Sequence, residues 1–384
     1  LCLNTSNNNT GKYVNNTSGT PGASLNTSDY RRPLIGFDFI VSCNAPSTLL
    51  ASNVTSSSVD VSWVESSLQP QNGYEYYLST TNTLPTTPTG TTNTGVSSVS
   101  LTSLPSGTNH YFWVRGNCGA SDKSLLIGPI AFTTLCNEVT DFVENFDSSP
   151  TGTGNLPICW EKSGSSNNIY NTTGSASPMS PANKLYMNIS ATTTAFAIMP
   201  PVSNLQANTH RLKFKSYATS AGKAMRVGYF AIQNDPLSFV SLEQFQLPGT
   251  VTSSTEEFTL YPTGIPAGIN QLVFSLVDGA SASAYIDDVK WEVSPSCPEP
   301  TSLTFTSLNS TTAILGWKVN GNETMWEIEY GPSNFPQGTG TTLSPINANS
   351  YTLSGLSANT DYTFYVRAIC STSSLSAWSN PFSF

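Results

Sequence analysis

The sequence predicts an all-β fold built from tandem β-sandwiches, and two observations support this prediction. Apolar and polar residues alternate with a period of two along many short runs, which is typical of strands with one face in a core. The stretch GTNHYFWVRGNC at 107–118 is closely similar to NTDYTFYVRAIC at 359–370. A chain of 384 residues is long enough for about two to four domains, so we interpret the two copies as parts of two similar domains.

Composition and charge exclude two classes of partner or location. Only 10% of the residues are charged, well below the roughly 25% of typical soluble domains. The formal net charge is −9 and no basic run occurs, so the chain would repel a phosphate backbone and we expect no nucleic-acid partner. No apolar run approaches the ~18 residues that a membrane-spanning helix needs, so we expect no membrane span in this sequence.

The first 42 residues differ from the rest of the chain in composition. They are rich in Asn, Thr and Ser up to the run LIGFDFIVS at 34–42, which alternates like a strand. We interpret residues 1–42 as a linker or as the tail of an upstream domain. Because the chain starts at Leu1 without a leader pattern and stops in the strand-like WSNPFSF, we expect it to be an excerpt of a longer protein.

The cysteines indicate disulfide bonds and therefore an oxidising compartment. There are seven, none forms a C-x-x-C pair, and the chain has only two histidines, so a zinc site is not expected. The intervals from Cys43 to Cys118 and from Cys297 to Cys370 are nearly equal in length. Each begins at CNAPSTL or CPEPTSL and ends at the repeated stretch, which predicts two similarly placed disulfides.

The remaining cysteines lie between and before the copies. Cys136 and Cys159 would pair with each other within the intervening segment, and Cys2 is left without a partner in this chain. The alternative interpretation is that all seven are reduced thiols of a cytosolic protein.

The similarity between the two copies extends beyond the quoted stretch. Each carries a tryptophan in its second alternating run, Trp63 in VDVSW and Trp317 in AILGW, followed by a third run, YEYYL or WEIEY. Each copy resembles a fibronectin type III domain. The resemblance implies an antiparallel β-sandwich over residues 43–135 and again over residues 297–384.

The corner before the repeated stretch distinguishes the two copies. In the fibronectin type III family a corner tyrosine tethers this turn through its hydroxyl, and Tyr362 takes that place in the second copy. The first copy has His110 at the same position. We interpret His110 as a structural substitute that can still donate one hydrogen bond.

Residues 136–296 have a different texture. Short alternating runs such as HRLKFKSYA and MRVGYFAI are separated by turn-rich pieces without a helical period, which predicts a jelly-roll sandwich. The ends, DFVENFDSSPTGTGNLPICW at 141–160 and AYIDDVKWEV at 284–293, resemble the first and last strands of cleaved-adhesin jelly rolls. These domains occur in Bacteroidota surface haemagglutinins and are similar to MAM domains.

The cleaved-adhesin resemblance implies a structural Ca²⁺ between the two end strands. Carboxylates of Asp147 and Asp287 would supply two of its oxygen ligands, which makes Ca²⁺ the expected cofactor. The alternative is that Asp147 opens a turn and that Asp287 or Asp288 only ends a pairing register. A glycosidase role for Asp287 and Asp288 is not expected, because adjacent strand residues point to opposite faces of a sheet.

The sequence does not predict catalysis. No G-x-S-x-G, H-E-x-x-H, P-loop or G-x-G-x-x-G motif occurs, and the only histidines, His110 and His210, lie in strand-like runs. We therefore expect no catalytic residue and no enzyme activity in this chain.

The sequence predicts a non-catalytic, multidomain, adhesin-like protein that is extracellular or on a bacterial cell surface. Fibronectin-like spacers would carry a jelly roll that binds glycans or another surface protein. The resemblance further implies a Bacteroidota source, type IX secretion, and secretion or surface-anchoring machinery as a partner. Two alternatives are ancillary modules of a larger secreted hydrolase and a structural stalk or filament.

The sequence does not identify the ligand-binding residues. For a sugar ligand, exposed aromatic side chains of the jelly roll are the expected platforms, because ring faces stack on the C–H faces of pyranoses. Four candidates in the segment are Trp160, Tyr170, Tyr186 and Tyr229.

Overall fold

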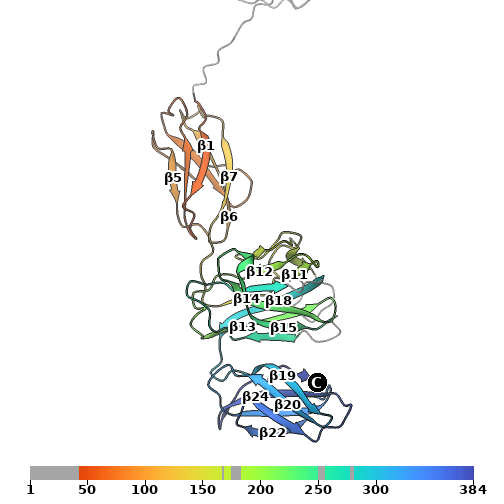
Figure 1. Cartoon of the computed structure of the whole chain (residues 1–384). Helices are drawn as coiled ribbons and strands as arrows, with labels where there is room; N and C mark the ends of the chain where they lie inside the picture. Colours follow the sequence, from red (N-terminus) through yellow and green to blue (C-terminus); the bar gives the residue numbers. More distant parts are fainter. Residues whose placement is uncertain (1–42, 167, 174–182, 250–255, 277–280) are drawn as a thin grey trace, which may run out of the picture.

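The computed structural model describes residues 43–166, 168–173, 183–249, 256–276 and 281–384. These residues form three β-sandwiches that follow one another along the chain, which confirms the all-β fold class (Figure 1). We call them the first sandwich (β1–β7), the middle sandwich (β8–β18) and the C-terminal sandwich (β19–β26). The tail predicted for residues 1–42, including Cys2, lies outside the described residues.

The first sandwich has one sheet in the order β1-β2-β5 and a second in the order β4-β3-β6-β7. Val59, Val61 and Trp63 alternate inward from one sheet and meet Phe112 and Val114 from the other, as the period of two predicts. The strands are β1 (Ser47–Ser52), β2 (Val59–Val64), β3 (Tyr74–Ser79), β4 (Gly90–Thr91), β5 (Ser98–Leu101), β6 (Asn109–Gly116) and β7 (Ile127–Thr133).

The C-terminal sandwich repeats this architecture. One sheet has the order β19-β20-β23 and the other the order β22-β21-β24-β25, with β26 paired to β24. Trp317 lies in the core at the position that Trp63 holds in the first sandwich. The strands are β19 (Thr301–Asn309), β20 (Thr312–Lys318), β21 (Trp326–Pro332), β22 (Thr341–Ile346), β23 (Ser350–Ser354), β24 (Tyr362–Ser371), β25 (Ser374–Leu375) and β26 (Phe382–Ser383).

The middle sandwich packs two larger antiparallel sheets. One has the order β10-β11-β18-β13-β16, with β8 also paired to β18, and the other has the order β15-β14-β17-β12-β9. Its core includes Phe146, Trp160, Phe214, Phe274 and Trp291. The elements are β8 (Phe142–Glu144), β9 (Glu161–Ser163), β10 (Ile169–Thr173), β11 (Asn183–Ile189), β12 (Ala195–Ile198), β13 (His210–Ala218), β14 (Lys223–Phe230), η1 (Pro236–Ser238), β15 (Phe239–Leu247), β16 (Glu256–Leu260), β17 (Val273–Leu276) and β18 (Ala282–Val293).

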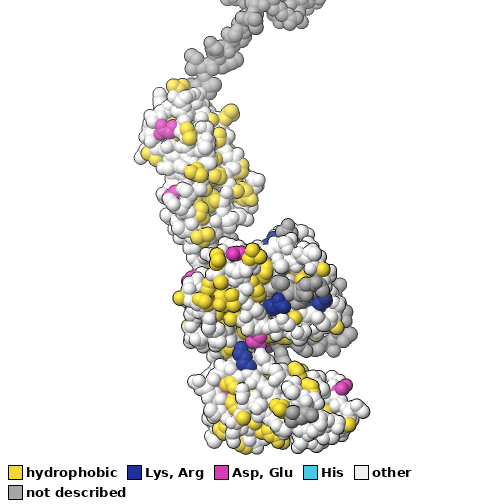
Figure 2. Space-filling model, in the orientation of Figure 1, with side chains coloured by type: hydrophobic (Ala, Val, Ile, Leu, Met, Phe, Trp, Pro, Cys, Tyr) yellow, Lys and Arg dark blue, Asp and Glu magenta, His cyan; other side chains and the backbone are white. Residues whose placement is uncertain are grey.

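The low charge content of the sequence is visible on the surface. Lys, Arg, Asp and Glu side chains are sparse on the face shown in Figure 2, and hydrophobic side chains gather on one side of the middle sandwich. Among the described residues, no helix is long and apolar enough to cross a membrane.

The two corner positions differ for a reason that the backbone explains. The hydroxyl of Tyr362 accepts a hydrogen bond from the Ser357 amide at 3.0 Å, which holds the C-terminal corner. The matching position in the first sandwich is Pro105, and proline has no amide hydrogen to donate. A tyrosine at position 110 would therefore lack its donor. His110 is instead buried and stacks on Phe132 with ring centroids 5.2 Å apart.

We expect the first sandwich to lose stability as the pH falls. Burial lowers the pKa of His110 in the folded chain. Below about pH 6.5, the ordinary pKa of histidine, the unfolded chain then binds more protons than the folded chain, so the free energy of unfolding decreases. Amide hydrogen exchange in β2 and β6 at pH 5 and pH 7.5 measures the effect, and His110→Phe should abolish it.

The C-terminal sandwich is the internal control, because residues 297–384 contain no histidine. An equal loss of protection at pH 5 in both outer sandwiches, or an unchanged loss in the His110→Phe chain, would show that His110 is not the cause.

Candidate functional site

Four tyrosines line up across the outer face of the larger sheet of the middle sandwich. Tyr170, Tyr186, Tyr285 and Tyr217 come from β10, β11, β18 and β13, which are neighbours in that order. Successive ring centroids are 5.2, 5.2 and 4.9 Å apart. We call this row the tyrosine strip.

The period of two places the tyrosine strip on the outer face. Leu185 and Met187 point into the core, so Tyr186 between them points outward. Tyr285 lies in the same way between Ala284 and Ile286, both of which are buried in the core. The cross-strand register then brings each tyrosine opposite the next one.

The tyrosine strip combines partly exposed rings with hydroxyl groups. Tyr170, Tyr186 and Tyr285 are half-buried, whereas Tyr217 is only 8% exposed. Burial raises the pKa of Tyr285, and the neighbouring phenols of Tyr217, Tyr186 and Tyr170 raise it further. The hydroxyl of Tyr186 lies 3.3 Å from Ser283 Oγ, which also accepts a hydrogen bond from Asn188 at 2.7 Å. The strip is thus an aromatic surface bordered by amides and hydroxyls.

Lys184 fixes one end of the tyrosine strip. Its Nζ donates to the Tyr217 hydroxyl at 2.9 Å and lies 5.2 and 4.8 Å from the ring centroids of Tyr217 and Tyr285. Only 5% of Lys184 is exposed, and this burial lowers its pKa, while the charge of Asp287 acts in the opposite direction. Lys184 is therefore a buried residue that packs against the rings rather than an exposed surface charge.

Two lysines, Lys184 and Lys215, lie near Asp287 and Asp288 in the structure. Asp287 is fully buried, accepts a hydrogen bond from the Asp288 amide at 2.7 Å, and is attracted to Lys184. Asp288 forms an ion pair with Lys215 at 2.8 Å. The regular alternation assumed from the sequence does not hold at this point, because the β13–β18 register shifts and Asp288 adopts a φ of 48°.

Asp147 lies in a second polar cluster, around the turn after β8. Its two carboxylate oxygens accept hydrogen bonds from the Asn183 amide at 2.9 Å and from Asn145 Nδ2 at 3.0 Å. Glu144 accepts from the Phe146 amide at 2.6 Å. Burial raises the pKa of Glu144, and the charge of Asp147 raises it further, so the two carboxylates lie close enough to repel each other.

Two features of this turn favour a bound cation, and the small number of metal-ligating side chains does not. Besides the Glu144 and Asp147 carboxylates, the carboxamide oxygen of the fully buried Asn171 has no hydrogen-bond partner. Its Nδ2 donates to the Phe146 carbonyl at 2.9 Å, which places Asn171 in the same turn. The charge of Asp287 acts on Lys184 and Lys215, and the described residues contain no group of three metal-ligating His, Cys, Asp or Glu side chains.

The described residues contain three disulfides. They join Cys43 to Cys118, Cys136 to Cys159, and Cys297 to Cys370. The first and third lie at matching places in the two outer sandwiches.

The second disulfide lies at the junction between the first and middle sandwiches. A Cβ on Gly107 would come within 2.7 Å of Cys159 Sγ, and Gly107 has a φ of 61°. The equivalent Asn359 adopts a similar φ of 54°. Position 107 therefore needs glycine because the disulfide of the middle sandwich packs against it.

The candidate aromatic platforms divide into two kinds. Trp160 and Tyr229 are buried in the core of the middle sandwich, so neither is available to a ligand. Tyr170 and Tyr186 lie on the outer face as neighbours in the tyrosine strip. The sequence analysis missed Tyr217 and Tyr285, whose outward phase could have been read from the alternation in KSYA and AYID.

The structure defines a multidomain β-sandwich protein, and comparison with known proteins assigns two of its parts. The family model for the fibronectin type III domain matches residues 44–126 and 298–384, which confirms the predicted resemblance for these two segments. No curated protein matches the chain.

Several solved structures are similar to part or most of this chain. A structure described as a myokine shows 24% identity over 23% of this chain and 96% of its own, with a TM-score of 0.21. Three fibronectin domains of chicken contactin 1 show 13% identity over 89% of this chain and 98% of theirs, with a TM-score of 0.23. The K1 cleaved adhesin domain of Lys-gingipain from Porphyromonas gingivalis shows 14% identity over 41% of this chain and 100% of its own, with a TM-score of 0.31.

Proposed function

We propose that this chain is a non-catalytic part of an extracellular, adhesin-like protein whose middle sandwich binds a glycan. The observation that carries the proposal is the tyrosine strip, in which four ring centroids follow one another at 4.9 to 5.2 Å across four strands. Aromatic faces stack on the C–H faces of sugar rings, and the adjoining hydroxyls and amides can bond sugar hydroxyls. The two outer sandwiches act as spacers.

The proposed location has separate support. Three disulfides in a chain of this kind favour an oxidising, extracellular environment, and fibronectin type III domains are typical of extracellular proteins. The sequence motifs at 141–160 and 284–293 are the basis for proposing a MAM-like cleaved-adhesin jelly roll, a Bacteroidota source and type IX secretion. A surface protein in place of the glycan is the competing ligand for the same strip.

We expect Tyr186→Ala to weaken glycan binding about ten-fold, which corresponds to about 1.4 kcal/mol, because the variant loses the central stacking ring. The double variant Tyr170→Ala/Tyr186→Ala should abolish binding. The measurement is binding of the chain to an array of neutral oligosaccharides, followed by calorimetry with the best array ligand.

Tyr111→Ala is the matched control, because Tyr111 is a half-buried strand tyrosine of the first sandwich. Equal binding by wild type, strip variants and control would contradict a role of the strip. If the folded wild-type chain retains no oligosaccharide on the array but binds matrix proteins in a strip-dependent way, the protein ligand is the correct one.

We also propose that the turn around Phe146 holds a structural Ca²⁺. The Glu144 and Asp147 carboxylates and the Asn171 amide oxygen would supply ligands, and the cation would relieve the repulsion between the two carboxylates. The bound ion would stabilise the β8 turn, and backbone carbonyls of the same turn could complete its coordination.

Calcium at about one hundred times its dissociation constant should stabilise the middle sandwich by about 2.7 kcal/mol, and EDTA should reverse this effect. Asp147→Asn should remove the calcium dependence, whereas Asp235→Asn, at the N-cap of η1, should retain it. The melting temperature of both variants, measured at increasing calcium concentrations, checks this prediction. An identical melting temperature with Ca²⁺ and with EDTA would show that the turn holds no calcium.

A further inference from the structure

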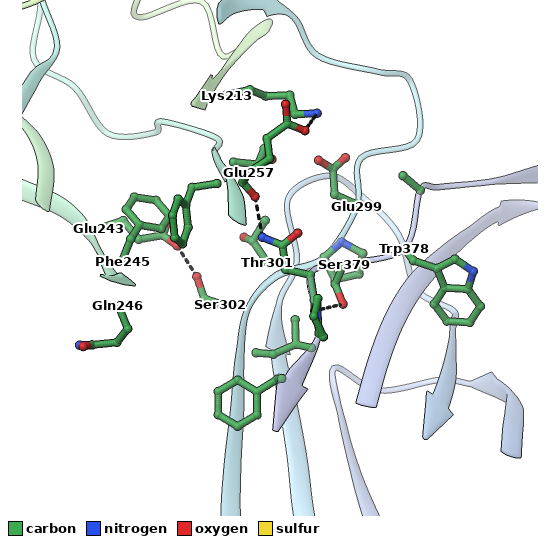
Figure 3. A pocket seen from close by; sticks show the side chains of 18 of the residues that line it. Lys213, Glu243, Phe245, Gln246, Glu257, Glu299, Thr301, Ser302, Trp378 and Ser379 are labelled. Carbon is green, nitrogen blue, oxygen red and sulfur yellow. Dashed lines mark hydrogen bonds and ion pairs between the residues drawn. The ribbon is translucent and has the colours of Figure 1, made fainter. Parts of the chain in front are cut away.

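A pocket of about 460 Å³ lies between the middle and C-terminal sandwiches. In Figure 3, Glu243, Phe245 and Gln246 of β15 approach it from one side, and Thr301, Ser302 and Ser379 lie across from them. The pocket is separate from the tyrosine strip, because none of the four strip tyrosines lines it.

The walls of this pocket are formed largely by the edges of sheets. β15 and β16 each end one sheet of the middle sandwich, and β19 ends a sheet of the C-terminal sandwich. An edge strand presents backbone N–H and C=O groups that no neighbouring strand pairs. Three edges therefore converge on one cavity.

The three edges are not equally able to accept another strand. β19 is interrupted by a register shift between Thr301 and Thr304, with Ser302 at a φ of 49°, and such irregularity disfavours pairing. On β16, the Glu257 carbonyl already accepts a hydrogen bond from Asn380 Nδ2 at 2.6 Å. The part of β15 that lines the pocket, residues 243–246, and the adjoining Leu247 keep a regular register with β14, so this segment is the best edge available.

The charged side chains of the pocket already have partners. Glu243 accepts from Ser302 and pairs with Lys318 at 3.1 Å. Glu257 pairs with Lys213. Glu299 pairs with Arg211 at 2.9 Å and accepts from the Tyr261 hydroxyl at 2.8 Å. The lining thus offers no unbalanced charge for an ionic ligand.

The four aromatic side chains that line the pocket already pack within the protein, including Phe382, whose ring centroid lies 5.7 Å from that of Phe364. Phe245 and Phe258 are only 8% and 6% exposed. The Arg367 guanidinium lies 4.4 Å from the ring centroid of Trp378, so this ring is already stacked. Backbone hydrogen bonding along β15 is the recognition chemistry that remains.

We propose that this pocket binds an extended, uncharged peptide segment of a partner protein, which adds a strand to β15. Main-chain hydrogen bonds to residues 243–247 would provide affinity, and alternate side chains of the peptide would face the pocket. The bound strand would contact both sandwiches. The proposal is independent of glycan binding by the tyrosine strip.

The test uses the complete chain and a pooled library of eight-residue peptides that alternate hydroxyl and β-branched residues. Each peptide that the chain retains is resynthesised and compared with two methylated versions. One version is N-methylated at the odd-numbered residues and the other at the even-numbered residues, and we call these the two phases. N-methylation removes backbone donors and retains every side chain. We expect one of the two methylated phases to bind at least about ten-fold more weakly, and amides 243–247 to gain protection from hydrogen exchange.

A pocket-filling variant provides the matched comparison. Gln246→Trp places a large ring in the pocket at an exposed position and should abolish peptide binding, whereas Gln233→Trp, an exposed position outside this pocket, should not. Three results would each overturn the proposal: no retained peptide, equal binding of both methylated phases and the parent, or protection confined to other strands. Glycan binding by the strip is unaffected by any of these results.

Discussion

Removal of the Cys297–Cys370 disulfide is expected to destabilise the C-terminal sandwich by about 2 to 5 kcal/mol. The two residues are 73 positions apart, so in the chain-entropy model the crosslink restricts a long loop of the unfolded chain and contributes roughly 4 to 5 kcal/mol as an upper value. Because the chain contains several sandwiches, the loss must be measured for each of them separately. Native-state hydrogen exchange in β20 and β24 of a Cys297→Ala/Cys370→Ala chain gives that resolution.

The Cys136–Cys159 disulfide provides a quantitative comparison within the same molecule. Its residues are only 23 positions apart, so the same model makes its contribution about 1 kcal/mol smaller. A Cys136→Ala/Cys159→Ala chain should therefore lose less protection in the middle sandwich than the other variant loses in the C-terminal one. Equal losses, or no loss in either, would show that loop entropy does not determine the stabilisation.

The sequence predicted the features that depend on local pattern. Alternation identified the strands, and the repeated intervals between cysteines indicated which ones could pair, because both signals lie within short stretches that recur. For one local feature, the sequence showed the substitution but not its cause. The alignment of the two copies shows that His110 replaces a corner tyrosine. The cause is Pro105, whose missing amide hydrogen matters only in the folded corner.

The candidate site depends on features that a single sequence does not reveal. Tyr217 and Tyr285 are neighbours only because β13 and β18 pair, although the two strands lie far apart in the sequence. Alternation shows that each of them points outward, but the order of strands decides that four rings meet. Asp287 was predicted as a calcium ligand from its motif, and the motif did not reveal that Lys184 and Lys215 lie near its carboxylate, because both come from other strands.

Lys184→Met is expected to destabilise the middle sandwich by about 1.5 to 3 kcal/mol, because it removes the ammonium that donates to the Tyr217 hydroxyl and that the charge of Asp287 attracts. Lys184 is 5% exposed and Asp287 is fully buried, so water compensates little for the lost positive charge. Urea unfolding and hydrogen exchange in β11 and β18 measure the loss. Lys213→Met is the matched control in the same sheet, since its ion pair with Glu257 is partly exposed and should contribute no more than about 1 kcal/mol.

The pairing can be separated from packing by a second substitution. Asp287→Asn in the Lys184→Met chain removes the buried charge and should recover part of the stability, because replacing both partners costs less than removing one. If the double variant is no more stable than Lys184→Met alone, the lysine acts through its packing. The same variants test the site, since the Lys184 ammonium also holds the Tyr217 hydroxyl at 2.9 Å. Loss of that contact removes a restraint on Tyr217 at one end of the tyrosine strip. Glycan affinity should therefore fall even under conditions in which the domain remains folded.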